Sequence, residues 1–443
     1  MEARKRYYIM TYGCQMNVHE SEKLAGILQE YGFCRADGAE SADIIVFNTC
    51  CIRESAETRV LGNLGRVKSL KDGNPSLIIA VCGCMTQNPG AAERLKKRCP
   101  FVDIIFGTHN LHKLGDYLSD LESKKTRVEI WDGENGSVVE DVPIARAEGV
   151  NAWVNIMYGC DNFCSYCVVP YVRGRERSRD MSVIVAEVKE LVSGGYKEIT
   201  LLGQNVNSYG RDGNDKGTNF AALLEKLSAL DGKFRIRFMT SHPKDLDENV
   251  IKTVAASDKV SDFIHLPAQS GSDRILGLMN RKYTAKEYLT KIETIKKYIP
   301  GAGLSTDIMV GFPSETEDDF AKTLGLVREA RYNNAFTFIY SRRSGTAADK
   351  MDGQIPYEVK KERIMRLIDL QAEIGSALAS ECVGKTYEML CDEYDPGQKT
   401  GRGKSDCGKT ITFGTDADRR GGFVRVKVTG AKNTNLYAEA CEE

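Results

Sequence analysis

The sequence lacks any apolar run long enough to cross a membrane, and its amino terminus lacks the apolar core of a secretory signal. It also lacks an excess of charge, because 61 Lys and Arg side chains nearly balance 62 Asp and Glu side chains. These absences argue against a membrane protein and leave no whole-chain signature of nucleic-acid binding. The composition is typical of a soluble globular protein, and we expect a cytoplasmic location without a membrane partner.

The length of 443 residues is sufficient for about three domains. Changes of pattern along the chain place the predicted domains at residues 1–145, 146–378 and 379–443. The chain contains 14 cysteines and no secretory signal. We therefore expect a reducing compartment, where clustered cysteines serve metals or catalysis more often than disulfides.

Three cysteines in one short loop are candidate ligands of an iron-sulfur cluster. Cys160, Cys164 and Cys167 form a C-x3-C-x2-C pattern. Since a 4Fe-4S cluster takes four ligands, three thiolates leave one iron open for the amino and carboxylate groups of S-adenosylmethionine. Reduction would then release a 5'-deoxyadenosyl radical. A zinc knuckle is the alternative, but it usually has a fourth cysteine or a histidine nearby, and no histidine lies between Asn151 and Thr240.

The first 145 residues alternate short apolar runs with helical patterns, which predicts an α/β domain with a mainly parallel sheet. Three of these runs lead into a cysteine, namely Cys14, Cys50 and Cys84. Parallel strands end at one edge of a sheet, so the three thiols can converge there and hold a second cluster. On spacing alone, small buried packing residues are an equally good interpretation of these cysteines.

The remaining cysteines are not predicted ligands. Cys51 and Cys82 lie beside candidate ligands and are possible competitors for that role. The others have no partner at ligand spacing, and we interpret them as packing or surface residues: Cys34, Cys99, Cys382, Cys391, Cys407 and Cys441.

Six strand-helix units between residues 151 and 340 predict a partial (β/α)6 barrel. The predicted strands span 152–157, 198–202, 234–239, 262–266, 304–310 and 335–340. Barrel chemistry takes place at the carboxyl ends of the strands, and the cysteine loop follows the first strand.

Other loops at the carboxyl ends of these strands contain polar or small residues, and they are candidates for holding S-adenosylmethionine and substrate. The candidate residues are Gln204, Asn205, Gln269 and Ser270, with further polar loops at 240–243 and 311–315. Well-capped turns are the alternative interpretation of these loops.

A basic run and a histidine complete the candidates in this region. Arg173, Arg175, Arg177 and Arg179 follow the cysteine loop and suit a carboxylate or a phosphate. We select Arg173 as a candidate contact to S-adenosylmethionine or substrate, whereas a solvated face is the alternative for the whole run. His265 lies within an apolar strand, and we interpret it as a residue that lines the barrel rather than a metal ligand.

The carboxyl-terminal region is predicted to form a helix followed by a small β-structure. Residues 357–382 keep one apolar face at helical spacing. Predicted strands at 385–391, 409–413 and 423–428 fit a small antiparallel barrel of the oligonucleotide-binding type. Between Ala379 and Glu443, ten Lys and Arg residues are matched by eleven Asp and Glu residues, so RNA binding would require positive charge to gather on one face. Residues 401–405 resemble the end of a phosphate-binding loop but lack its first glycine and its helix.

Seven motifs resemble the radical-SAM methylthiotransferase family, and the four in the barrel region resemble the branch that modifies isopentenylated tRNA. Three lie in the amino-terminal region, at 11–17 (TYGCQMN), 48–54 (NTCCIRE) and 83–87 (GCMTQ). Four lie in the barrel region, at 203–209 (GQNVNSY), 235–243 (RIRFMTSHP), 265–272 (HLPAQSGS) and 306–313 (TDIMVGFP). The carboxyl-terminal module resembles the RNA-binding TRAM domain of the same family.

The resemblance implies two 4Fe-4S clusters, an auxiliary one on Cys14, Cys50 and Cys84 and a radical-generating one on Cys160, Cys164 and Cys167. It also implies S-adenosylmethionine as a cofactor and a methylthio group added to C2 of N6-isopentenyladenosine beside the anticodon of tRNA. The implied partners are the tRNA anticodon stem-loop, a low-potential electron donor such as flavodoxin or ferredoxin, and a sulfur or cluster donor protein.

Two rival hypotheses remain at this point. The first keeps the chemistry but changes the substrate to threonylcarbamoyl-adenosine tRNA or to an aspartate of a ribosomal protein. The second is a non-catalytic protein that carries a cluster or binds RNA.

Overall fold

The computed structural model describes residues 4–50, 54–124, 128–130, 138–146, 149–213, 217–239 and 241–441. Cys51 and Thr240 therefore lie outside the described residues. The chain divides into two compact units. Unit 1 contains Met1–Glu148, Met157–Phe163 and Cys167–Arg179, and unit 2 contains Gly149–Ile156, Cys164–Tyr166 and Asp180–Glu443. The three domain ranges expected from the sequence stay a prediction.

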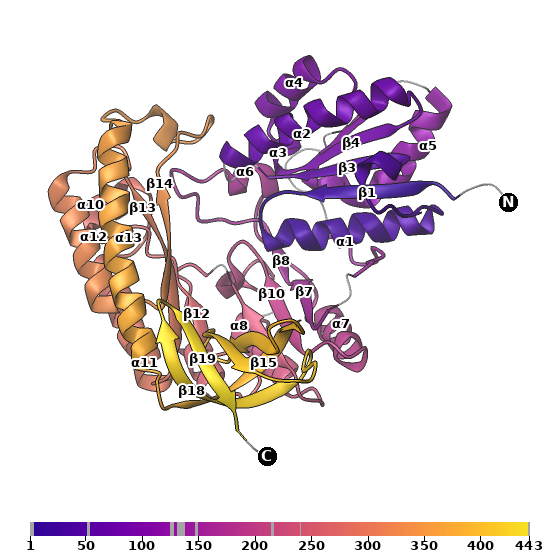
Figure 1. The fold of residues 1–443 in the computed structure, drawn as a ribbon. Helices are drawn as coiled ribbons and strands as arrows, with labels where there is room; N and C mark the ends of the chain where they lie inside the picture. Colours follow the sequence, from indigo (N-terminus) through magenta and orange to yellow (C-terminus); the bar gives the residue numbers. More distant parts are fainter. Residues whose placement is uncertain are drawn as a thin grey trace. The chain divides into compact units, whose positions relative to one another are not determined.

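Unit 1 is built on a six-stranded sheet in the order β2-β1-β3-β4-β5-β6. The strands are β1 Arg6–Thr11, β2 Cys34–Arg35, β3 Ile44–Thr49, β4 Ile78–Gly83, β5 Ile104–Phe106 and β6 Val128–Ile130. Every neighbouring pair is parallel, so all six carboxyl ends lie at one edge. The predicted α/β domain with a parallel sheet is confirmed (Figure 1).

Helices cover both faces of this sheet, because alternate side chains of each strand point to opposite sides. One face packs against α1 Gln15–Glu30 and α5 Leu114–Lys124, and the other packs against α2 Glu54–Gly73 and α4 Pro89–Arg98. The shorter elements of the unit are listed here: η1 Ala39–Ser41, α3 Cys84–Gln87, η2 Thr108–Lys113, β8 Met157–Tyr158, α6 Val169–Arg173 and β9 Arg177–Ser178.

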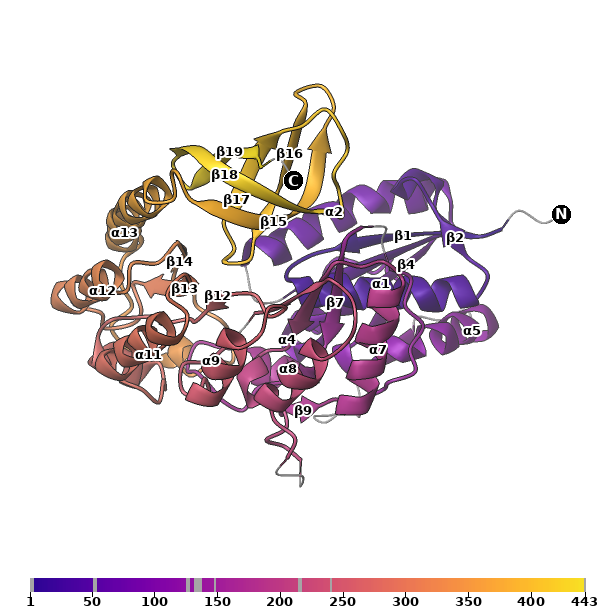
Figure 2. The same cartoon turned by 90° about the horizontal axis from the view of Figure 1, so that it is seen from below.

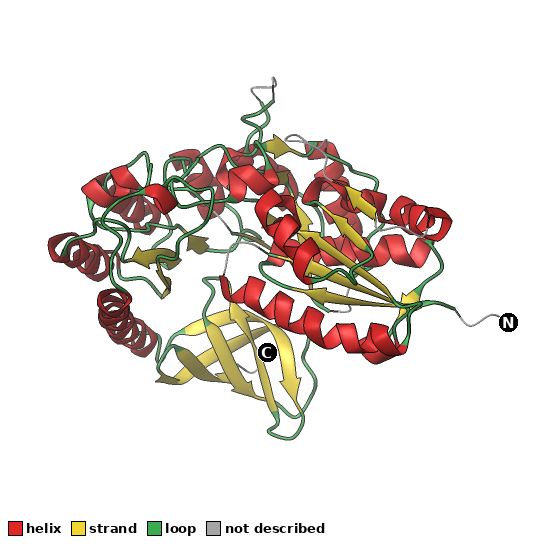
Figure 3. Ribbon diagram, turned by 90° about the horizontal axis from the view of Figure 1, so that it is seen from above, coloured by secondary structure: helices red, strands yellow, loops and turns green. Residues whose placement is uncertain are grey.

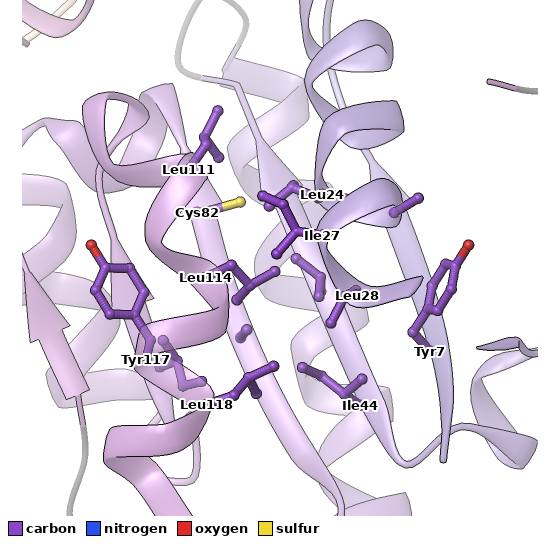
Figure 4. Packing of buried hydrophobic residues seen from close by; sticks show 14 of the residues in the cluster. Tyr7, Leu24, Ile27, Leu28, Ile44, Cys82, Leu111, Leu114, Tyr117 and Leu118 are labelled. Carbon is purple, nitrogen blue, oxygen red and sulfur yellow. The ribbon is translucent and has the colours of Figure 1, made fainter. Parts of the chain in front are cut away.

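Cys82 belongs to the apolar core of unit 1. It is fully buried on the face of β4 that packs against α1 and α5, among residues such as Leu24, Ile27 and Leu111 (Figure 4). Burial raises the pKa of the Cys82 thiol well above its ordinary value, so this thiol stays neutral. The structure therefore accounts for Cys82 as a packing residue.

The central part of unit 2 contains the six predicted barrel strands. They are β7 Asn151–Asn155, β10 Glu198–Leu202, β11 Arg235–Phe238, β12 Phe263–His265, β13 Gly303–Val310 and β14 Asn334–Ile339. They form two parallel three-stranded sheets, β7-β10-β11 and β12-β13-β14, with a parallel bridge from Ile236 to Val260 between them. The partial (β/α)6 barrel is confirmed.

Helices follow the barrel strands and lie outside them, as Figure 2 shows. They are α7 Met181–Ser193, α8 Phe220–Ser228, α9 Glu248–Ala255, α10 Asp273–Leu278, α11 Ala285–Tyr298 and α12 Glu317–Ala330, with 3-10 turns η3 Val206–Ser208 and η4 Ala348–Lys350. Several begin at a polar cap that accepts helix-end N–H groups, such as Asp180 before α7 and the Thr316/Asp319 capping box of α12.

The chain ends in helix α13 Tyr357–Ser380 and a closed five-stranded barrel (Figure 3). Its strands are β15 Thr386–Asp395, β16 Thr400–Ser405, β17 Thr410–Gly414, β18 Phe423–Lys432 and β19 Asn435–Ala440. The sequence predicted β15, β17 and β18 but not β16 and β19. The predicted small barrel is confirmed, and its neighbouring strands are antiparallel except for β17 and β19, which run parallel where the barrel closes.

This small barrel is anchored at the amino ends of the central strands. Arg237 of β11 donates to the Ser405 carbonyl oxygen at 2.9 Å, and Arg235 pairs with Asp406 at 3.0 Å. A Cβ atom on Gly303, at the start of β13, would lie 1.9 Å from the Cys407 carbonyl oxygen. Within unit 2 the small barrel therefore docks opposite to the carboxyl ends of the strands. No helix among the described residues is long and apolar enough to cross a membrane.

Candidate metal centre

Cys14, Cys50 and Cys84 directly follow three adjacent strands of the unit 1 sheet. Strand β1 pairs with β3, and β3 pairs with β4, with Thr11 opposite Asn48 and Thr49 opposite Gly83. The three turns therefore leave the sheet side by side at its carboxyl edge. This is the place where open α/β sheets bind ligands.

Two glycines allow these turns to approach one another closely. Gly13 has φ +110°, and a Cβ atom there would lie 2.4 Å from the Cβ of Cys50 and 2.8 Å from its Sγ. Gly83 has φ +99°, and a Cβ atom there would lie 2.3 Å from the Thr49 carbonyl oxygen. Any other residue would be strained and would clash at either position. The close approach brings the backbones that carry the three cysteines together.

A buried pair of asparagines holds these turns in place. The Asn17 side-chain amide donates to the Thr49 carbonyl oxygen at 2.9 Å, and the Asn48 amide donates to the Asn17 carbonyl oxygen at 2.8 Å. The Cys14 Sγ lies 3.4 Å from Asn17 Oδ1. Analysis of the sequence missed both asparagines, although each lies within a motif that contains a cysteine. Asn48 is a polar residue inside the otherwise apolar strand β3, and Asn17 lies in the first turn of α1.

Arg173 is the cation of this site. Its Nε lies 3.1 Å from Cys84 Sγ, and its guanidinium forms a buried ion pair with Glu20 of α1, with one Nη2 to Oε2 distance of 3.1 Å. A guanidinium stabilises a nearby thiolate, which is the form of cysteine that binds iron. The sequence did not predict Glu20 as a site residue, because its only feature there is its position on an amphipathic helix.

Helix α6 connects the cysteine loop to this site within unit 1. Cys84 packs against Val168 and Val172, and Val168 directly follows Cys167. Cys167 accepts a hydrogen bond from the Val169 N–H at 3.4 Å. Cys160 donates its N–H to the Gly174 carbonyl oxygen at 3.2 Å. Within unit 1, the helix that follows Cys167 therefore packs against Cys84.

Cys164 belongs to unit 2. Arg281 lies 3.6 Å from its Sγ and also donates to the Pro267 carbonyl oxygen at 2.6 Å. The next residue, Ser165, donates its N–H to the Met279 carbonyl oxygen at 3.0 Å. Arg281 thus ties the middle cysteine of the loop to the turn after β12. It escaped the sequence analysis because it lies far from the cysteine motif in the chain.

The donor set fits iron-sulfur clusters in chemical type. Both triplets consist of thiols, and a buried arginine lies within hydrogen-bond distance of one thiol in each. Soft thiolates of this kind select iron-sulfur clusters or zinc. No group of three His, Cys, Asp or Glu side chains within the described ranges closes on one point as a single ion would require. A cluster holds its cysteines farther apart than one ion does, because its own atoms lie between them.

The other predicted site residues lie in the barrel loops. Asn205 follows β10 and donates to Asp245 at 2.7 Å, and Gln204 beside it is half-buried. Gln269 has φ +67° and exchanges backbone hydrogen bonds with Asp307 and Met309. Ser270 is buried, and its hydroxyl lies 3.3 Å from Thr323 Oγ1. These contacts shape the turns, and the assignment of the four residues to S-adenosylmethionine stays a prediction.

His265 and the basic run have protein partners. His265 Nδ1 lies 2.8 Å from the Ser305 hydroxyl, which suits a residue lining the barrel. The basic run is not one solvated face, because Arg173 and Arg179 are buried and Arg179 pairs with Glu140 at 2.6 Å. Arg175 alone is largely exposed, with Asp161 at 3.4 Å.

Three buried polar side chains after β10 and β11 present atoms without a protein partner among the described residues: Asn207, Ser241 and His242. His242 Nδ1 accepts the Lys244 N–H at 3.2 Å, so the ring proton lies on Nε2, which has no acceptor in the described part of the chain. Burial lowers the pKa of His242 to about 2, and the ring is neutral. Such atoms suit a polar cofactor, since buried polar groups are normally paired.

Comparison with protein families matches two parts of the chain. Residues 6–107 match the uncharacterized protein family UPF0004, and residues 154–327 match the Radical SAM superfamily. The chain also resembles the solved structure of the radical S-adenosylmethionine methyltransferase TsrM from Kitasatospora setae, with a TM-score of 0.57, 12% identity, and coverage of 89% of this chain and 79% of that chain. The cobalamin-dependent radical enzyme OxsB gives a TM-score of 0.51 at 12% identity and covers 84% of this chain and 56% of that chain. Both likenesses concern the fold.

Curated relatives match almost the whole chain. A tRNA-2-methylthio-N(6)-dimethylallyladenosine synthase of Clostridium botulinum is 51% identical over 98% of this chain and 96% of its own length. Synthases of the same name from Pelotomaculum thermopropionicum and Caldicellulosiruptor saccharolyticus are also 51% identical over 98% of this chain, covering 97% and 92% of their own lengths. The chain belongs to the radical-SAM methylthiotransferase family, together with the tRNA-2-methylthio-N(6)-dimethylallyladenosine synthases.

Proposed function

We propose that this protein adds a methylthio group to C2 of N6-isopentenyladenosine next to the anticodon of tRNA. The observation that supports the proposal is the pair of cysteine triplets, one that follows three adjacent parallel strands of the unit 1 sheet and one within a single short loop. The names of relatives at 51% identity supply the substrate.

The ligand assignment follows the two triplets. Cys14, Cys50 and Cys84 would hold the auxiliary 4Fe-4S cluster, and Cys160, Cys164 and Cys167 would hold the radical-generating one. When bound, the clusters and S-adenosylmethionine supply the methyl group, the sulfur and the radical that removes hydrogen from the adenine ring.

The chain's own residues position these groups. Arg173 donates toward the Cys84 sulfur and favours its thiolate form, while Glu20 fixes the orientation of the guanidinium. Arg281 donates toward the Cys164 sulfur at 3.6 Å. In the barrel, Gln204, Asn205, Gln269 and Ser270 are the proposed contacts to S-adenosylmethionine or to the substrate. His242 would donate its Nε2 proton to an acceptor on the cofactor or the substrate.

The target base lies in a single-stranded loop of the RNA. A base in such a loop is turned out of its stack at modest cost and enters a pocket. On the small barrel, residues of β16 alternate between buried and exposed, so Arg402 and Lys404 both face outward. They are the proposed start of an RNA-binding face. A low-potential electron donor such as flavodoxin or ferredoxin, and a sulfur or cluster donor protein, complete the proposed partners.

Mass spectrometry of tRNA nucleosides from a strain that lacks the gene tests this proposal. We expect isopentenyladenosine to accumulate in place of its 2-methylthio derivative, and the complementing gene should restore the product. If the strain instead lacks methylthiolated threonylcarbamoyl-adenosine or a methylthiolated ribosomal aspartate, that molecule is the product of the enzyme and the proposed substrate is wrong. Purified protein that cleaves no S-adenosylmethionine under strong reductant would indicate a non-catalytic protein.

A further inference from the structure

Unit 1 contains a pocket that the candidate metal centre does not use directly. It has a cavity volume of about 70 Å³, opens to solvent, and lies between α1, the η2 turn, the segment 138–142 and the strand pair β8-β9. Its charged lining residues are Lys23, Arg173, Arg177 and Glu20. Three cations therefore face one carboxylate, and Arg173 already engages that carboxylate.

Lys23 is the residue that identifies the pocket as a binding site. Its side chain is about nine-tenths buried. Its ammonium donates to the Tyr158 hydroxyl at 3.1 Å, and no carboxylate of the described residues lies within ion-pair distance of it. In the described part of the chain its one hydrogen-bond partner is a neutral phenol, so its desolvation is not offset there by a counter-charge. An anion in the pocket would supply that counter-charge.

The surroundings of Lys23 are also electropositive. One turn earlier on α1, burial and then the charges of Lys23, Arg146 and Arg179 hold the pKa of His19 well below its ordinary value. The lining of the pocket also includes the apolar side chains of Val138, Val139 and Val142. A group with several anionic oxygens on a partly apolar carrier fits this combination, since Lys and Arg cations share the oxygens of one phosphate.

We propose that this pocket binds a phosphate group through Lys23, Arg173 and Arg177. The RNA backbone is one source of that phosphate, and this part of the inference rests on the proposed function. Free inorganic phosphate is the other source. Because Arg173 also contacts the Cys84 sulfur, a phosphate held here would lie one side chain away from the auxiliary site.

The test measures RNA affinity of the full-length, cluster-reconstituted protein by fluorescence anisotropy. The probe is a labelled anticodon stem-loop that carries isopentenyladenosine. We expect Lys23→Gln to weaken binding about tenfold, as loss of a charged hydrogen bond does. It should also reduce the slope of log K against log salt by about 0.7. Lys23→Arg should retain most of the affinity. Lys97→Gln, an exposed charge loss in the same unit, is the matched control and should change neither value.

A second measurement uses the unmodified protein, so the inference does not depend on how Lys23→Gln folds. Inorganic phosphate should compete with the RNA at constant ionic strength, and its binding should broaden the phosphorus NMR line. Phosphate binding that requires Lys23, without an effect on RNA, would support the pocket with free phosphate as its ligand. Absence of both effects would overturn the inference. If the wild-type protein forms no methylthio product yet shows these effects, the proposed function fails and the phosphate site stands.

Discussion

The two cysteine triplets are built in opposite ways. Cys160, Cys164 and Cys167 lie within one short loop, so their proximity is guaranteed by the covalent chain. Cys14, Cys50 and Cys84 follow three different strands, and only the pairing of β1, β3 and β4 brings their turns together. The first set is therefore a property of a local motif, whereas the second depends on the whole sheet. Damage to the sheet should affect the second set more strongly than the first.

Within unit 1, a buried arginine links the segment that follows the cysteine loop to the turn that contains Cys84. Arg173 lies at the end of the helix that follows the cysteine loop, yet it contacts the sulfur of Cys84 and the carboxylate of Glu20. The cation that contacts Cys84 therefore comes from the segment next to the loop triplet in the sequence. The following predictions separate the two sets or break this link.

Removal of either cysteine triplet should have the largest effect. The unmodified protein should bind about eight irons per chain, and replacing either triplet with alanine should leave about four. Both variants should lose methylthio product. The variant without Cys160, Cys164 and Cys167 should also release no 5'-deoxyadenosine, whereas the variant without Cys14, Cys50 and Cys84 should still release it. Iron analysis and chromatography of the products measure both effects, and loss of all iron in either variant would contradict the assignment of separate ligand sets.

Arg173→Gln should have the next largest effect, because it leaves the buried Glu20 carboxylate without its partner. We expect a loss of about 3–5 kcal/mol in the free energy of unfolding. Chemical denaturation of the apo protein measures it. Arg175→Gln is the matched control, since its ion pair with Asp161 is exposed, and it should change stability by less than about 1 kcal/mol. Equal effects of the two substitutions would show that Arg173 does not form the buried link.

Gly13→Ala should be less harmful overall but selective for the auxiliary site. The positive φ costs about 1–3 kcal/mol, and the added methyl group would collide with Cys50. We expect iron content to fall toward that of the variant without the amino-terminal triplet. Gly32→Ala has a similar φ of +82° but meets no atom within 4 Å. That control should lose stability and retain its iron. Loss of iron from it would show that the collision with Cys50 is not the cause of iron loss in Gly13→Ala.

Cys82→Ala should have the smallest effect. The thiol packs in the apolar core of unit 1, so its loss should cost about 1–2 kcal/mol of stability. The iron content and the activity should stay at the values of the unmodified protein. A drop of about four irons would instead make Cys82 a ligand, in place of one of the three cysteines assigned to the auxiliary cluster.

Much of the architecture was predictable because it depends on local patterns. The six barrel strands and three of the unit 1 strands were located within a few residues, since runs of apolar residues between polar turns are typical of buried parallel strands. Strands β16 and β19 were missed because neither contains such a run of apolar residues. Residues 400–405 alternate glycine with charged residues, and their strand forms because the glycines pack closely beneath Phe413 and Leu390. Such packing leaves no apolar pattern in the sequence.

The sequence by itself determined the loop triplet, the parallel sheet, the partial barrel and the family resemblance. Tertiary structure alone decided that Cys14 and Cys84 have contacts with Asn17 and Arg173, that Cys82 is a core residue, and that Lys23 lines a cationic pocket. The reason is physical. Spacing along the chain fixes which atoms a short loop can bring together, but a contact between distant segments exists only after strand pairing and helix packing have set their distance.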